Sequence, residues 1–148
     1  MFSTIGNALP VLLMVLNENR QIVYANSRLG ERLGLGNNGT ILGQRPGEVF
    51  CCEHAWETPG GCGTSDQCRF CGAFRAIQKS LNGEQAVEEC RLTNAQGEAF
   101  EFRVWATPYP HQGQCYTLFS LLDIAAEKRR DALERTFFHD ILNTAGGI

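Results

Sequence analysis

Long apolar runs are missing from this chain of 148 residues. The longest uninterrupted one, at 8–16, has nine residues and contains Pro10, whereas a membrane-spanning helix needs about 20. An excess of positive charge is missing too, because 13 Lys and Arg stand against 16 Asp and Glu, for a net charge of −3. We therefore expect no membrane span and no nucleic-acid partner.

The beginning of the chain also lacks the positively charged segment that opens a secretory signal. This absence favours a cytoplasmic location. The composition, with 43% hydrophobic and 20% charged residues, is that of an ordinary globular protein and excludes a disordered or fibrous chain. The length suffices for one domain with a short appendage.

Cysteine, by contrast, is abundant, since the chain has seven. Five of them fall within 21 positions, between residues 51 and 71, and the other two stand alone. An odd number of cysteines without a secretory signal argues against a disulfide framework. In a reducing compartment such a cluster is more often a metal site or a reactive one.

Apolar periodicity and turn residues predict an α+β fold. After Cys68 the apolar spacing becomes helical, with Phe74, Ile77 and Leu81 on one face. The economical packing is a five-stranded antiparallel sheet with short helices on one face. The expected elements, in chain order, are a hairpin over 11–24, a short helix at 28–33, a turn-rich stretch at 34–43, a short helix within 41–50, a cysteine-rich loop at 51–67, a helix ending at 81, strands at 85–93, 98–107 and 114–123, and a long helix from 124 onward.

Four cysteines in the loop have the spacing of a metal site. Cys52, Cys62, Cys68 and Cys71 form the pattern C-x9-C-x5-C-x2-C, with glycines beside two of them. Four thiolates can bind Zn²⁺ or an iron-sulfur cluster, and the spacing does not distinguish the two. We favour zinc slightly, because a glycine-rich loop with so few core residues needs a structural link. His54 is an alternative ligand to one of the thiolates.

The other cysteines have simpler interpretations. Cys51 is expected in the core or behind the metal ligands, because two adjacent cysteines seldom bind one ion. Cys90 and Cys115 lie in expected strands and are interpreted as small core residues. Without a metal, the loop is expected to hold free thiols, among which Cys68 and Cys71 could form a disulfide switch.

The order of elements resembles that of a PAS domain, over residues 5–123 with a cysteine-rich insertion at 51–72. Asn26 after the second strand is PAS-like, and so are Asp123 and Ile124 before the exit helix. The resemblance implies a PAS-like five-stranded antiparallel sheet followed by a long C-terminal helix. It also implies a sensory module of a signalling protein, with the ligand of the PAS pocket unknown.

The segment from Phe137 to Thr144 resembles the H-box of a sensor histidine kinase. Residues 124–148 would then be a signalling helix and a truncated dimerisation and phosphoacceptor domain. The resemblance implies that His139 is the phosphoacceptor, that Asp140 assists proton transfer and that Asn143 orients the reaction. The sequence contains no glycine-rich ATP-binding motif, so kinase activity of this chain alone stays open and we expect a segment of a longer kinase.

Together these features predict the sensory and phosphoacceptor segment of a cytoplasmic two-component sensor histidine kinase. Its cysteine-ligated metal centre would respond to redox state or oxygen. The expected partners are a second copy, bound through the C-terminal helix, and the receiver domain of a response regulator. Two alternatives stay open: a zinc-stabilised PAS protein-interaction module without a sensing role, and a metal-free thiol redox switch.

Overall fold

The computed structural model describes residues 2–34 and 41–146. The turn-rich stretch expected at 34–43 therefore falls largely outside the described residues. The helices and strands are, in chain order, α1 (Phe2–Ala8), β1 (Leu12–Leu16), β2 (Ile22–Ala25), α2 (Ser27–Leu33), α3 (Pro46–Val49), the 3-10 helix η2 (Asp66–Phe70), α4 (Gly72–Leu81), β3 (Ala86–Thr93), β4 (Ala99–His111), β5 (Gln114–Asp123) and α5 (Ala125–Gly146).

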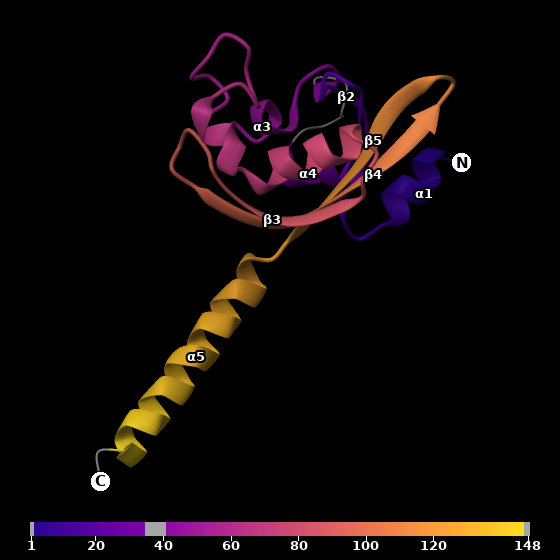
Figure 1. The fold of residues 1–148 in the computed structure, drawn as a ribbon. Helices are drawn as coiled ribbons and strands as arrows, with labels where there is room; N and C mark the ends of the chain where they lie inside the picture. The colour runs from indigo at the N-terminus through magenta and orange to yellow at the C-terminus, as the bar shows by residue number, and fades with distance from the viewer. Residues whose placement is uncertain (1, 35–40, 147–148) are drawn as a thin grey trace.

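The strands form one antiparallel sheet in the order β2-β1-β5-β4-β3. The first strand thus pairs with the last, as in Leu12 opposite Leu121. The amino-terminal and carboxy-terminal strands therefore lie side by side in the middle of the sheet. Helices α3 and α4 lie on one side of this sheet, and α5 projects away from it (Figure 1). The expected five-stranded antiparallel sheet with short helices and a C-terminal helix is confirmed.

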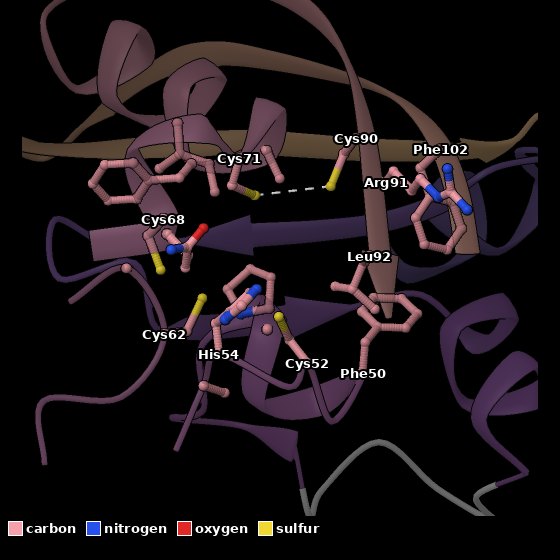
Figure 2. A pocket seen from close by; sticks show the side chains of 18 of the residues that line it. Phe50, Cys52, His54, Cys62, Cys68, Cys71, Cys90, Arg91, Leu92 and Phe102 are labelled. Carbon is pink, nitrogen blue, oxygen red and sulfur yellow. Dashed lines mark hydrogen bonds between the residues drawn. The ribbon is translucent and has the colours of Figure 1, made fainter. Parts of the chain in front are cut away.

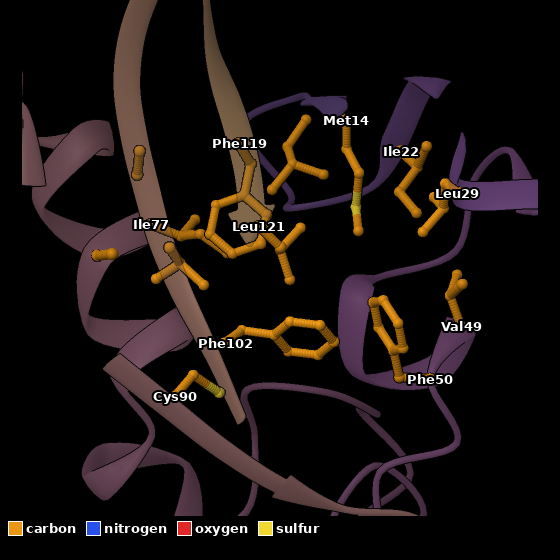
Figure 3. Packing of buried hydrophobic residues seen from close by; sticks show 14 of the residues in the cluster. Met14, Ile22, Leu29, Val49, Phe50, Ile77, Cys90, Phe102, Phe119 and Leu121 are labelled. Carbon is orange, nitrogen blue, oxygen red and sulfur yellow. The ribbon is translucent and has the colours of Figure 1, made fainter. Parts of the chain in front are cut away.

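The core lies between the sheet and the helices. Its centre is Phe102, which is 1% exposed and packs against Phe50 with ring centroids 5.3 Å apart (Figure 3). Inward-facing residues of β1, β4 and β5 meet the apolar face of α4 there, including the expected Ile77. Alternation along these strands gave the sheet its single apolar face.

Helix α1 was not expected from the sequence, because its residues have little helical periodicity. It is held in place by Asn26, whose amide donates to the carbonyl oxygens of Gly6 and Val11 at 2.9 Å each. The same side chain accepts from the backbone N–H groups of Leu13 and Leu29. One buried side chain thereby joins α1, β1 and α2, a tertiary contact that no local pattern reveals.

Strand β4 is longer than expected, since it continues through Pro108 to His111. Proline interrupts a strand that is paired on both edges, because it lacks an N–H donor. Ala106 is the last β4 residue that pairs with β3, so beyond it β4 pairs with β5 alone. The free edge tolerates Pro108 and Pro110.

Helix α5 begins where Asp123 accepts a hydrogen bond from the N–H of Ala125 at 2.9 Å. Its first turn contacts the sheet, and every described side chain from 129 to 144 is exposed. Large apolar side chains are among them: Leu133, Phe137, Phe138, Ile141 and Leu142. In the part of the chain that the structure describes, no helix is both long and apolar enough to cross a membrane.

Candidate functional site in the cysteine-lined cavity

A cavity of about 290 Å³ lies between the cysteine-rich loop, the beginning of α4 and the inner face of the sheet. Phe50, Phe74 and Phe102 form part of its apolar wall. Figure 2 shows the sulfur-bearing residues around it. Those residues, from three separate parts of the chain, are Cys52, Cys62, Cys68, Cys71 and Cys90. All four cysteines singled out by their spacing are therefore brought to one cavity.

The loop cysteines are placed by contacts with α3. The N–H of Cys52 donates to the carbonyl oxygen of Gly47 at 2.7 Å. A Cβ added to Gly47 would lie 2.6 Å from the sulfur of Cys62, so a larger residue here would displace that side chain. Arg20 and Arg45 each donate to the carbonyl oxygen of Cys62 at 3.1 Å. The loop is thus held by backbone contacts that need no metal.

The C-x2-C pair lies where η2 meets α4. Cys68 is buried in η2, and Cys71 is the residue that precedes the first turn of α4. The N–H of Cys71 donates to the carbonyl oxygen of Cys68 at 3.0 Å. Because the amino-terminal end of a helix carries partial positive charge, this position favours the thiolate form of Cys71.

The fifth cysteine of the cavity, Cys90, lies on β3 with its sulfur 3.9 Å from that of Cys71 (Figure 2). It is 4% exposed, so its expected burial is confirmed, but no sequence pattern indicated that it borders the other cysteines. Cys51 and Cys115 are exposed. The expected place of Cys115 in the core is wrong, and so is the core alternative for Cys51. Cys115 pairs with Pro110 near the end of the β4–β5 hairpin, where the helices do not cover the sheet.

The surroundings of the thiols change their acidity in different directions. Burial raises the pKa of Cys62 to about 11 and also raises that of Cys52. The hydrogen bond between Cys71 and Cys90 lowers the pKa of Cys71 and raises that of Cys90. Burial therefore favours the neutral thiol of Cys62, and metal binding there must displace its proton.

The donors do not converge on a single point. Among the described residues, no three His, Cys, Asp or Glu side chains are grouped so that they could hold one ion. A zinc ion needs its thiolates at about 2.3 Å, in a tetrahedron. The cysteines instead line the wall of a cavity that is much larger than one ion.

His54, the alternative ligand, lines the same cavity, but both of its ring nitrogens face carboxylates. Its Nδ1 lies 2.5 Å from Oε1 of Glu57, and its Nε2 lies 3.4 Å from Oε1 of Glu53. Hydrogen bonds from Ser65 and His54 lower the pKa of Glu57. To bind a metal, His54 would have to leave one of these partners, so its role as a ligand stays a prediction.

A positive charge borders the cavity. Arg20 lines its wall, and its guanidinium lies 5.3 Å from the ring centroid of Phe74. Burial and the neighbouring Arg45 lower the pKa of Arg20, but an arginine remains charged at neutral pH. The charge favours thiolates or an anionic cluster over neutral thiols.

The residues of the predicted H-box lie on α5, far along the chain from the cavity. His139 is exposed, and the side-chain nitrogen of Asn143 lies 3.3 Å from its ring nitrogens. Oδ1 of Asp140 lies 3.6 Å from Nδ1 of His139. One helix turn thus brings the three side chains together, but their roles in phosphotransfer stay a prediction.

No protein-family model and no curated protein sequence matches this chain, whereas solved structures do. A PAS domain of nitrogen regulation protein NR(II) from Vibrio parahaemolyticus is similar over 84% of this chain and 98% of that one, with 17% identity and a TM-score of 0.58. A PAS domain from a two-component sensor histidine kinase matches 82% of this chain and 92% of that one, with 11% identity and a TM-score of 0.56.

An RNA-binding light-oxygen-voltage receptor matches 93% of this chain, with 17% identity and a TM-score of 0.65, but the match spans only 36% of that receptor's length. At these identities the likeness concerns the fold and not the ligands or partners of those proteins. The similar proteins include domains described as PAS, and these match more than four fifths of this chain. The chain therefore has the PAS fold.

Proposed function

We propose that this chain is the sensory segment of a two-component sensor histidine kinase, with its input at the cysteine-lined cavity and its output on α5. One observation carries the proposal: four cysteines chosen by spacing alone line a single cavity inside a PAS fold. The last strand of that fold continues directly into an exposed helix that bears His139. A signal in the cavity and a phosphoacceptor on the helix would then belong to one continuous unit.

The centre in the cavity is a cysteine-ligated metal group held by Cys52, Cys62, Cys68 and Cys71. Between the two metals considered, an iron-sulfur cluster fits better than zinc, because the cavity has room for several atoms and its donors do not converge on one point. The charge of Arg20 supports an anionic group. Such a cluster supplies one-electron chemistry and sensitivity to oxygen, which suits a redox or oxygen sensor.

Elemental analysis of protein isolated without air tests this centre. We expect iron with acid-labile sulfide and a broad visible absorption, which Cys62→Ser should lose and the exposed control Cys115→Ser should keep. One zinc per chain without iron would overturn the cluster in favour of a structural site. Absence of any metal would overturn the metal centre altogether.

The output is phosphorylation of His139, with Asp140 and Asn143 beside it. The exposed apolar side chains of α5 support a helical dimer, since Leu133, Phe137 and Ile141 would otherwise stay in water. The receiver domain of a response regulator is the expected acceptor of the phosphoryl group.

The kinase that contains this segment, supplied with labelled ATP, tests the output. We expect His139→Gln to abolish labelling and His111→Gln, at the end of β4, to leave it unchanged. Labelling that survives in His139→Gln would overturn the assignment of the phosphoacceptor.

A further inference from the structure

We infer that Cys71 and Cys90 form a thiol pair that a hydroperoxide closes to a disulfide when the cavity thiols are free of metal. The pair shares Cys71 with the proposed metal centre. It does not depend on that centre, because Cys90 is not among the proposed ligands and its sulfur lies 3.9 Å from that of Cys71. The spacing of the cysteines suggested Cys68 as the disulfide partner of Cys71, and the structure offers Cys90 instead.

The position of the pair is set by the backbone on both sides. Its sulfur atoms are 3.9 Å apart, and a disulfide needs about 2.05 Å. A Cβ on Gly72 would lie 2.9 Å from the carbonyl carbon of Glu89 and closer still to its oxygen, so α4 begins directly against β3. With the backbones this close, rotation of the two side chains can close the remaining distance.

The two cysteines differ in the way that an attacking and a resolving thiol differ. Cys71 is partly exposed at the amino-terminal end of α4, a helix of ten residues. Cys90 is buried and can be reached by its neighbour more easily than by a solute. Cys71 is therefore the site of attack on the oxidant, and Cys90 resolves the product.

The reaction balances with one hydroperoxide. The Cys71 thiolate attacks a peroxide oxygen, the O–O bond breaks, and hydroxide leaves and takes up a proton, which gives a sulfenic acid at Cys71. The Cys90 sulfur then attacks the Cys71 sulfur, breaks its S–O bond and loses its own proton, so that water leaves. Two thiols lose two electrons in total, and hydrogen peroxide is reduced to two waters.

Strand β3 connects this pair to the signalling helix. Glu89, the neighbour of Cys90, forms an ion pair with Lys128 of α5 at 2.6 Å. Arg103 lies between the carboxylates of Glu89 and Glu127, at 3.7 and 3.6 Å. Because successive side chains of a strand point to opposite faces, β3 carries the thiol on the inner face and the contact with α5 on the outer face. A shift of β3 at Cys90 therefore reaches the first turn of α5 directly.

The test uses the full chain, stripped of metal by a chelator without air and then treated with an equimolar amount of hydrogen peroxide. After alkylation of the remaining thiols, peptide mass spectrometry should find residues 71 and 90 linked. Cys90→Ser and Cys71→Ser should both lose this link, and Cys115→Ser should keep it. A disulfide between Cys68 and Cys71, or no intramolecular disulfide, would overturn the inference.

Two further measurements separate this inference from the proposed metal centre. Cys90→Ser should still bind metal when reconstituted, because Cys90 is not among the four proposed ligands, whereas it should form no disulfide with Cys71. Hydrogen exchange over the first turn of α5 should differ between the reduced and oxidised wild-type chains and not in Cys90→Ser. A wild-type chain that binds no metal but forms the disulfide would refute the metal centre and support the thiol pair.

Discussion

Replacement of Gly72 by alanine should destabilise the protein, although alanine is the better helix former. The helix preference alone would stabilise α4 by about 1 kcal/mol. The added Cβ, however, would lie 2.9 Å from the carbonyl carbon of Glu89, where ordinary contact begins at 3.4 Å. Since the obstacle is backbone and the carbonyl oxygen of Glu89 is closer still, α4 and β3 must move apart by more than about 0.5 Å, and overpacking of this kind costs about 3 kcal/mol at the upper end of its usual range. We expect a net loss of about 2 kcal/mol.

Urea unfolding of the reduced, metal-free chain measures this loss. With a slope of about 2 kcal/mol per molar urea, the midpoint should fall by about 1 M while the slope stays the same. Gly83→Ala, beyond the other end of α4, is the control, because its φ of +88° adds strain but no atom lies within 4 Å. Both variants should lose stability, but only Gly72→Ala should also form less of the disulfide between Cys71 and Cys90. A Gly72→Ala chain as stable as the wild type would refute the close approach of α4 to β3.

Three other changes follow from the same structure. Asn26→Ala removes a helix cap worth about 1 kcal/mol and leaves buried backbone groups unpaired, which costs about 1–3 kcal/mol. Urea unfolding should therefore show a loss of stability of about 3 kcal/mol. A loss below about 1 kcal/mol would contradict the role of Asn26 in joining α1, β1 and α2. Phe102→Ala should cost about 3–5 kcal/mol in the same assay, and a near-neutral result would contradict its central place in the core. The hydrogen bond with Lys128 lowers the pKa of Glu89, and Glu89 raises that of Lys128. The attraction between Glu89 and Lys128 is therefore fully present above the ordinary pKa of Glu, and it is lost as pH falls through the lowered pKa of Glu89. At high pH it is lost as pH rises through the raised pKa of Lys128. The protection of the first turn of α5 against hydrogen exchange, taken relative to the intrinsic exchange rate at each pH, should be greatest between these limits, and Glu89→Gln should remove its fall at low pH.

Much of the fold follows from local patterns in the sequence. The alternation of Phe100, Phe102 and Val104 indicates a strand with one buried face, and the spacing of Phe74 and Ile77 indicates the helix that covers it. The end of β4 could not be located in this way. Whether Pro108 interrupts a strand depends on whether a neighbouring strand is paired there, and pairing is a property of the sheet.

The residues of the cysteine-lined cavity could likewise be predicted only in part from the sequence. A spacing of nine, five and two residues between cysteines, with glycines that let the loop turn back, was enough to select four of the five that line it. Cys90 has no such spacing, and its alternation in β3 identifies it only as buried. Its sulfur meets that of Cys71, 19 positions away, because Gly72 lets helix and strand approach closely. The spacing of cysteines along the chain thus identifies the candidate ligands. The contact between Cys71 and Cys90, by contrast, forms only when α4 packs on the sheet.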